Sequence, residues 1–332
     1  MRVPRPYIAN SYEFMQSINA YRALGILLCF VELGGCGSGA PPVAAPLVSQ
    51  RDAVTVRPDR DRSWMTPGVK KTPLLYVSDV GTGDVDVYAY PGGTLMGKLT
   101  GFVRPAGLCV DKKGNVFVTD LFSQRILEYA HGGTEPIETL TDAGEDPGDC
   151  AVDLANGELA VTNVSNAYSG SGDVVIYRGA KRRPKKYTDR ALVYYQFCGY
   201  DNRGNLYVDG ASLGDFQLAE LPAGKTAFEN ITLDESIRDA GAVQWDGGSL
   251  AVGDYESNRI YEFSIIGTSG STVGVTNLGG ADFAIGFWIQ GHTVIGPNDD
   301  SQNVMFWNYP TGGSPTKTLD GLSYPWGATV SP

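Results

Sequence analysis

One five-residue pattern recurs six times between residues 75 and 297 of this 332-residue chain, and its spacing limits the folds available. The clearest copy is VFVTD at Val116–Asp120, and successive copies end 41 to 47 residues apart. A period in this range is typical of β-propellers, in which each repeat forms one four-stranded blade. The other copies are Leu75–Asp79, Leu159–Asn163, Leu206–Gly210, Leu250–Asp254 and Thr293–Pro297.

The residues around each copy supply the other strands of such a blade. An apolar stretch such as Pro105–Asp111 comes first, and a turn such as Lys113-Gly114-Asn115 joins it to the motif. Glycine and asparagine suit tight hairpin turns because they tolerate positive φ angles. A third alternating stretch, a glycine turn and a short polar stretch follow, as in residues 85–99. The sequence therefore predicts an all-β fold, a six-bladed β-propeller of four-stranded antiparallel blades.

The two ends of the repeat region are complementary. The chain enters the repeats on a second strand, at Leu75, and leaves them on an inner strand, Pro325–Val330. We expect the C-terminal strand to complete the blade that Leu75 begins, because this pairing closes the ring and removes an open sheet edge. The predicted propeller domain spans residues 71–332.

The N-terminal region has the features of an export signal. Arg22 precedes the short apolar run Ala23–Val31, which ends close to small residues. A run of this length behind a basic residue is typical of a signal peptide rather than of a membrane span. Met15 is an alternative start to Met1, because a signal that begins there has an ordinary length.

Leu33-Gly34-Gly35-Cys36 resembles the lipobox of bacterial lipoproteins. The resemblance implies that residues 1–35 are a lipoprotein signal peptide and that lipidated Cys36 anchors the mature chain to a membrane. Residues 36–70 would follow as a flexible, Pro-rich linker. Gly37 stands where an aspartate would retain such a protein at the inner membrane, so we expect an exported cell-envelope lipoprotein of the outer membrane, where one exists. A plain secretory signal and a non-functional apolar tail are the alternatives.

The charge of the chain restricts its general partners. The net charge is −11, and an acidic surface disfavours nucleic acid and anionic lipid. The segment Arg178–Lys186 (RGAKRRPKK) is a basic exception and falls where a blade's outer turn belongs. It is interpreted as a solvated hairpin tip, with a contact for anionic glycans or lipid headgroups as the alternative.

The positions of the cysteines and histidines do not point to a catalytic or metal-binding site. Cys109, Cys150 and Cys198 fall on predicted inner strands, and strand alternation makes Cys109 face the opposite way from the other two. A Cys150–Cys198 disulfide would have to span two blades, so we expect buried free thiols. The two histidines, His131 and His292, fall in turns away from the end of the ring where a site is expected. This disfavours a histidine base or a histidine-bound metal there.

The repeat resembles the NHL-repeat superfamily, most clearly over Pro105–Ile126, PAGLCVDKKGNVFVTDLFSQRI. Its six-bladed gluconolactonase and senescence-marker relatives bind a divalent cation with a glutamate that starts one inner strand. The predicted inner strands of this sequence do not start with glutamate, so that metal ligand cannot be carried over. The resemblance thus implies the fold and leaves the activity of those enzymes in doubt.

Polar side chains gather at the predicted upper face, where loops enter the inner strands and join the second strands to the third. These residues suit a Ca²⁺-like divalent cation or a hydroxylated ligand. The alternative is turn capping, because Asp and Asn after a strand often bond their own turn backbone. The candidates are Asp79, Arg104, Asp120, Asp146, Asp149, Asn163, Asp239, Asp254 and Asn298.

The preferred function is a binding or scaffold module for a protein or carbohydrate ligand. The alternative is a gluconolactonase-like, metal-dependent hydrolase with altered ligands. No catalytic residue is assigned, and the only cofactor considered is the divalent cation. Trp245, Trp288 and Trp326 on inner strands are expected in the core between blades. We expect a monomeric ring that meets the membrane through its lipid alone and binds no nucleic acid.

Overall fold

The structure of the protein is a computed structural model that describes residues 62–142, 144–166, 170–178, 183–212, 214–282 and 284–332. The predicted signal peptide, the lipidation site Cys36 and most of the predicted linker lie outside the described residues. Residues 61–332 form one unit. A short strand, β1 (Trp64–Met65), pairs with the first sheet, so the last residues of the predicted linker belong to the fold.

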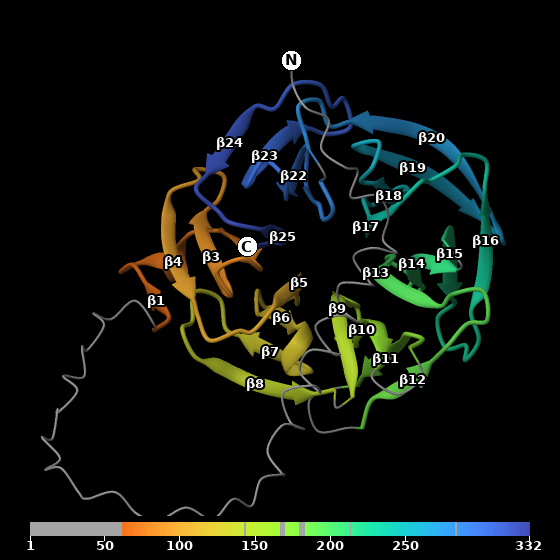
Figure 1. The fold of residues 1–332 in the computed structure, drawn as a ribbon, viewed down its shortest axis with the longest axis horizontal. Helices are drawn as coiled ribbons and strands as arrows, with labels where there is room; N and C mark the ends of the chain where they lie inside the picture. Colours follow the sequence, from red (N-terminus) through yellow and green to blue (C-terminus); the bar gives the residue numbers. More distant parts are fainter. Residues whose placement is uncertain (1–61, 143, 167–169, 179–182, 213, 283) are drawn as a thin grey trace, which may run out of the picture. The chain divides into compact units, whose positions relative to one another are not determined.

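The described strands form small sheets arranged in a ring (Figure 1). The first sheet has the order β1, β4 (Leu95–Leu99), β3 (Asp84–Ala89), β2 (Leu74–Asp79) and β25 (Pro325–Ser331). The second contains β5 (Pro105–Val110), β6 (Val116–Asp120), β7 (Arg125–Tyr129) and β8 (Pro136–Thr141). The third contains β9 (Glu145–Val152), β10 (Leu159–Asn166), β11 (Asp173–Tyr177) and β12 (Lys185–Tyr187).

The next sheet is a pair of four-stranded meanders. The first meander is β13 (Tyr194–Tyr200), β14 (Leu206–Ser212), β15 (Asp215–Leu221) and β16 (Glu229–Leu233). The second is β17 (Ala240–Trp245), β18 (Leu250–Asp254), β19 (Arg259–Ile266) and β20 (Ser269–Asn277). A short parallel pairing of β16 with β20 joins the meanders into one eight-stranded sheet. The ring continues with β21 (Trp288–Gln290), β22 (Thr293–Asn298), β23 (Asn303–Asn308) and β24 (Lys317–Asp320).

The predicted strands agree closely with the observed ones, and the repeated motif forms the second strand of each meander. Inner strand β9, however, begins at Glu145, two residues before the predicted Pro147, so the expectation that no inner strand starts with glutamate is wrong. The largest difference is β21, which was predicted to begin at Ala284 and begins at Trp288. The carbonyl of Ile285 instead accepts a hydrogen bond of 3.1 Å from the amide of Ala242 in the neighbouring inner strand. The backbone at Ile285 is therefore bonded to the inner strand of an adjacent meander rather than paired with β22.

Apolar side chains fill the layers between neighbouring sheets. Alternation along β6 sends Val118 towards Tyr76 of the preceding sheet and Phe117 towards Val161 of the following one. Fully burying one large apolar side chain contributes about 1.5–3 kcal/mol. Each sheet depends on both neighbours for this burial, because its two faces are covered by different sheets.

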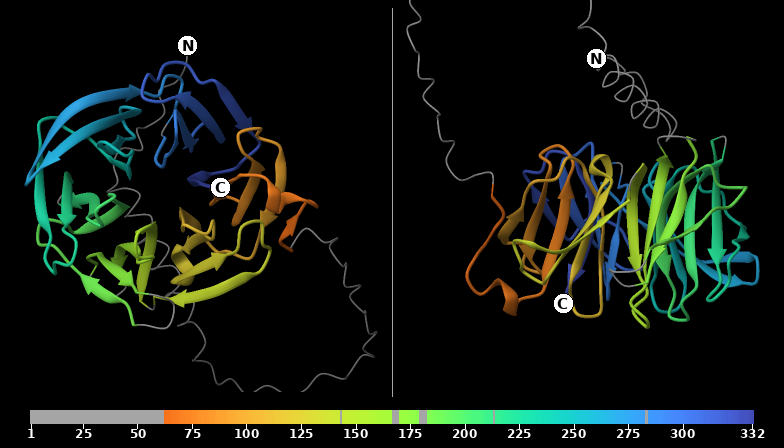
Figure 2. Two further views of the ribbon diagram at one scale, coloured as in Figure 1. Left: turned by 180° about the vertical axis from the view of Figure 1, so that it is seen from behind. Right: turned by 90° about the horizontal axis from the view of Figure 1, so that it is seen from below.

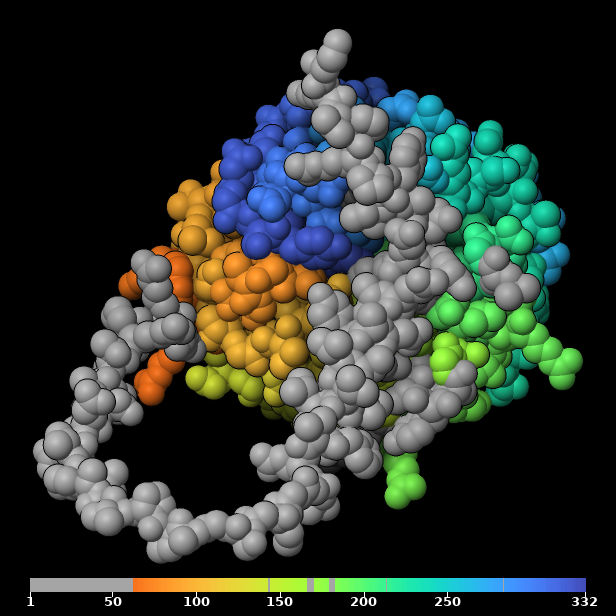
Figure 3. Space-filling model, in the orientation of Figure 1, coloured from red at the N-terminus to blue at the C-terminus, as the bar shows by residue number. Residues whose placement is uncertain are grey.

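The ends of the folded region pair as predicted. Strand β2 lies antiparallel to β25, with Leu75 opposite Val330 and Val77 opposite Ala328. Figure 3 shows the early residues in orange beside the C-terminal ones in blue. Beyond this ladder, the Ser331 hydroxyl donates to the carbonyl of Gly114 at 2.6 Å, which ties the last strand to the second sheet as well.

The prediction of free thiols at Cys109 and Cys150 is wrong, because these residues form a disulfide with their Cα atoms 5.7 Å apart. The bond joins β5 to β9, the inner strands of neighbouring sheets. Neighbouring sheets pack face to face, so two cysteines can meet only when they point in opposite directions from their own sheets. Strand alternation gives Cys109 the orientation opposite to that of Cys150, and this is the orientation that a disulfide between neighbouring sheets requires. Cys198 is buried and free, as expected.

We predict that the double variant Cys109→Ala, Cys150→Ala lowers the free energy of unfolding by about 4 kcal/mol, the loop-closure value for cysteines some 40 residues apart. Denaturant unfolding of parent and variant measures the difference. Reducing the parent should reproduce the loss, whereas Cys198→Ala should cost much less and should not change the response of the protein to reductant. Equal midpoints for the oxidised parent and the double variant would contradict the prediction.

Candidate functional site

The upper face is the end of the ring formed by the loops that enter the inner strands and the loops that join second strands to third strands. Figure 2 shows the ring from the side, with the strands running between its two faces. In most meanders the second strand carries a buried polar residue at or near its end on this face. These residues are Asp79, Asp120, Asn163, Asp254 and Asn298.

The carboxylates of two predicted residues bind backbone amides of the loop that enters the inner strand of the same sheet. Asp79 accepts hydrogen bonds from the amides of Ser323 and Tyr324 at 2.8 and 2.9 Å. Asp120 accepts them from Val103 and Arg104 at 3.0 and 2.8 Å. Such bonds satisfy loop donors that would otherwise be buried unpaired.

Asp254 and Asn298 repeat this contact more weakly. Asp254 faces the amide of Asp239 at 3.4 Å, and Asn298 accepts from the amide of Asp282 at 3.2 Å. The first residue of the third strand completes some of these sites. Arg125, for example, pairs with Asp120 at 3.0 Å. These side chains therefore cap chiefly the loop that enters the inner strand rather than their own turn, as the capping alternative had it, although Asp79 also accepts a hydrogen bond of 3.1 Å from the amide of Gly81 in its own turn.

The other predicted residues lie in three different settings. Asp146 is buried and accepts a hydrogen bond of 2.7 Å from the Ser165 hydroxyl. Asn163 is buried and donates to Asp173 at 2.8 Å. Asp239 is buried just before β17, and Arg104 and Asp149 are described below. The predicted belt is thus not one ligand shell.

Among the described residues, no three His, Cys, Asp or Glu side chains lie close enough together to hold a metal ion. Part of the basic segment Arg178–Lys186 forms ion pairs with acidic side chains. Lys186 lies 2.6 Å from Asp173 and 2.5 Å from Glu145, and Arg178 lies 2.8 Å from Glu158.

Aromatic and charged side chains from several sheets meet on the upper face, and we call Arg104, Phe122, Asp299, Tyr324 and Trp326 the mouth cluster. The Arg104 guanidinium lies 5.2 Å from the centre of the Phe122 ring, which is 38% exposed. Tyr324 stacks on Trp326 with ring centres 6.2 Å apart. Burial raises the pKa of Asp299 to about 6, although a hydrogen bond with the Tyr324 hydroxyl opposes the shift.

A small cavity of about 50 Å³ lies on the axis of the ring. One residue from each inner strand, or from the loop just before it, lines this cavity at the same position of the repeat: Gly107, Asp149, Phe197, Ala242, Gly286 and Gly327. Four of these six residues are Gly or Ala and leave space open at the axis. The other two carry larger side chains. Trp288 and Trp326, predicted as core between blades, also line it.

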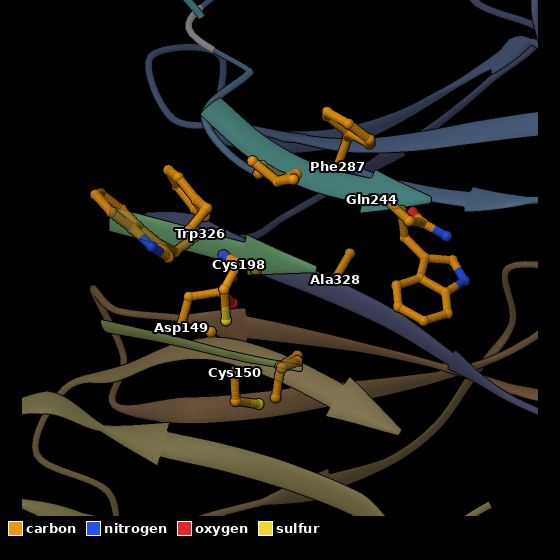
Figure 4. A pocket seen from close by; sticks show the side chains of 15 residues that line it. Asp149, Cys150, Cys198, Gln244, Phe287, Trp326 and Ala328 are labelled. Carbon is orange, nitrogen blue, oxygen red and sulfur yellow. Dashed lines mark hydrogen bonds between the residues drawn. The ribbon is translucent and has the colours of Figure 1, made fainter. Parts of the chain in front are cut away.

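Asp149 extends its carboxylate into the axial region. A Cβ atom on Gly107 would lie 2.3 Å from Asp149 Oδ1, so the carboxylate occupies space that a side chain at position 107 would fill. Asp149 Oδ2 accepts a hydrogen bond of 3.1 Å from the amide of Cys198. Figure 4 shows Asp149 beside Cys198, with Gln244 on another strand, β17. Burial raises the pKa of Asp149 to about 7, against hydrogen bonds from the amides of Cys198 and Cys150.

A second carboxyl group lies close behind this wall. Asp209 is fully buried, and its Oδ1 accepts a hydrogen bond of 3.0 Å from the amide of Phe197. Its Oδ2 has no hydrogen-bond partner among the described residues. Burial, with Asp149 nearby, raises the pKa of Asp209 well above its usual range.

Sequence reasoning missed Phe122, Tyr324 and Asp299 because they lie in loops outside the repeated motif. A signal was nevertheless present: Tyr324 and Arg104 each precede the proline that begins an inner strand, at equivalent positions of two repeats. Reading side chains across repeats at that position would have placed both residues at the axis end of the upper face.

No protein-family model matches the sequence, and no curated protein matches it. A chain from the crystal structure of a nidogen–laminin complex superposes with a TM-score of 0.65 at 15% identity, covering 78% of this chain and 98% of its own. A protein of unknown function from Bacteroides caccae superposes with a TM-score of 0.59 at 10% identity, covering 78% of this chain and 99% of its own. These likenesses show an all-β, propeller-like fold. None of the described helices is long and apolar enough to cross a membrane.

We predict that Asp79→Ala, Asp120→Ala and Asp254→Ala each lower the free energy of unfolding by about 1–3 kcal/mol, because each removes hydrogen bonds made by a buried charge. The three losses should add to within about 0.5 kcal/mol, since the residues belong to different sheets and share no partner. Denaturant unfolding of single, double and triple variants tests this, with exposed Asp300→Ala as control. Strong non-additivity, together with a rise in the melting temperature of the parent on adding calcium, would indicate a shared ion instead.

Proposed function

We propose that this protein is an exported, membrane-anchored β-propeller of NHL type that acts as a binding or scaffold module for a protein or carbohydrate ligand. Counting the two meanders of the eight-stranded sheet separately gives six blades, the number that the repeats predict. The mouth cluster is the proposed contact surface.

The composition of the mouth cluster carries the proposal. Arg, Tyr and Trp supply most of the energy at protein interfaces, because they combine a large apolar area with a fixed polar group. The same stacked rings, beside a carboxylate, suit the faces and hydroxyl groups of a sugar. The nidogen–laminin chain, which has the same kind of fold, comes from a complex of two proteins, and this supports a binding role.

Export and anchoring have separate support. Disulfides persist in oxidising compartments outside the cytosol, and the Cys109–Cys150 bond fits such a location. The lipobox-like sequence that ends at Cys36 supports lipid attachment, and Gly37 supports the outer membrane where the organism has one. In this proposal the ring is monomeric, and the lipid holds it at the membrane.

We expect Cys36→Ser to move the protein from the membrane fraction to the soluble fraction, because lipid is the anchor that the sequence offers. Fractionation of cells that express parent and variant measures the change. Cys29→Ser, within the apolar run, is the matched control and should leave the protein in the membrane fraction. Retention of the Cys36→Ser variant in membranes after a high-salt wash would contradict the anchor.

For the mouth cluster, we expect Phe122→Ala and Arg104→Ala each to weaken ligand binding by about tenfold or more, as for interface residues worth over 1.4 kcal/mol. Glycan arrays and cross-linking to envelope proteins identify the ligand with the parent protein, and titration then compares the variants. Leu154→Ala is the control, because Leu154 is exposed in a turn between a first and a second strand, at the other end of the ring. Unchanged affinity in both variants would exclude this surface.

A further inference from the structure

The axial cavity presents an acidic group without a basic neighbour. Asp149 is its charged lining residue, and Lys, Arg and His are absent from the described residues that line it. Buried carboxylates are normally paired with a cation or bound by several donors, because an unpaired buried charge is costly. The amides around Asp149 supply hydrogen bonds but no positive charge. The cavity therefore favours a positively charged occupant.

The rest of the lining distinguishes an organic cation from a metal ion. Phe287, Trp288, Trp326 and Leu108 form much of the wall, and the oxygen-bearing side chains are those of Asp149 and Gln244. The Gln244 amide is already engaged, since it donates to the carbonyl of Ile289 and accepts from the amide of the same residue. A calcium ion requires six to eight oxygen ligands. An alkylammonium group instead needs one anion and suits aromatic walls, which attract cations.

The size and position of the cavity fit such a group. Its volume of about 50 Å³ is several times the roughly 10–15 Å³ that a cavity needs to hold one water, so a terminal methylene and an ammonium group can enter together. Trp326 lines the cavity and also stacks on Tyr324 of the mouth cluster, so the cavity adjoins the proposed contact surface. A ligand held at the mouth could extend a short chain to Asp149.

We propose that the axial cavity binds the ammonium group of a primary alkylamine, such as the end of a lysine side chain, with Asp149 as its counterion. The inference rests on the proposed function, because the mouth cluster would hold the remainder of the ligand. Cys198, the other titratable group of the lining that is not in a disulfide, has a pKa raised by burial and adds no charge near neutral pH.

The first experiment titrates the full chain with n-butylammonium at pH 8 and follows tryptophan fluorescence, because Trp288 and Trp326 line the cavity. n-Butanol, of the same shape and without charge, is the control ligand. We expect a saturable change with the amine and none with the alcohol at equal concentration. Equal responses to both, a response to calcium or potassium alone, or no response to the amine would overturn the proposal.

The second experiment uses Asp149→Asn, which removes the charge and keeps an oxygen that can accept from the amide of Cys198. We expect affinity for butylammonium to fall by about tenfold or more, as for loss of a charged hydrogen-bond partner. Asp300→Asn removes an exposed charge elsewhere on the upper face and should leave affinity within about twofold, since exposed charges are screened. Equal losses of affinity in both variants would mean that the net charge of the protein, and not Asp149 itself, determines butylammonium binding, and this would contradict the assignment.

A pH series on the parent needs no variant and keeps the proposal testable if Asp149→Asn does not fold. Binding requires the ionised carboxylate, whose pKa is about 7. Affinity should therefore be about tenfold weaker at pH 6 than at pH 8, and flat from pH 8 to pH 9. A flat profile from pH 6 to pH 9 would contradict Asp149 as counterion. Loss of Phe122-dependent binding with butylammonium binding intact would remove the proposed function and leave this cavity assignment standing.

Discussion

The pairing of β2 with β25 is the contact on which the ring depends. It joins Leu74 to Ser331 across almost the whole folded chain. Asp79 reinforces it by binding the amides of Ser323 and Tyr324, just before β25 begins. The apolar layers lie between neighbouring sheets. A ring left open would therefore expose one apolar sheet face on each side of the gap. Closure therefore stabilises sheets that are remote from the seam, and the disulfide between β5 and β9 adds a second fixed joint close to it.

The repeat is regular where it holds the ring together and irregular where the cavity lies. Ser78, Thr119 and Thr162, each just before the end of a second strand, donate to a backbone carbonyl of the next inner strand at 2.6, 3.1 and 2.8 Å. The following meander has Asp209 at this position and Gly210 after it, so it lacks both the hydroxyl and the capping side chain. Asp149 and Phe197 interrupt the Gly and Ala series in the same part of the ring. Departures from local rules in natural proteins concentrate at functional sites, and Asp149 at the axial cavity is such a departure, although Gly253 and Gly296 also replace the hydroxyl residue in the last two motif strands.

Most of the fold could be predicted because strand alternation, turn residues and period all act locally. The motif strands, the joining turns and the pairing of the C-terminal strand with the first sheet follow from those signals. The disulfide was missed because it depends on how two sheets face each other, although the opposite orientation of Cys109 was inferred correctly. Asp79, Asp120 and Asp254 were identified as one set, but their hydrogen-bond partners are loop amides whose positions no spacing rule supplies. The mouth cluster was missed for a related reason: Phe122, Asp299 and Tyr324 meet only after separate sheets are brought together.

The raised pKa of Asp149 links stability to occupancy of the cavity. A folded-state pKa of about 7, above the ordinary value of 3.8, means that the folded protein holds this proton more tightly than the unfolded chain does. The stabilisation is complete below the ordinary pKa and is lost as pH rises through about 7. At neutral pH and above, the side chain thus works against folding unless something offsets its charge. A neutral residue here would avoid that cost, and the inner strands of most other meanders do carry Gly or Ala at this position. A bound ammonium group would offset the charge where protonation no longer does, so the same carboxylate that weakens the empty ring would tighten the occupied one.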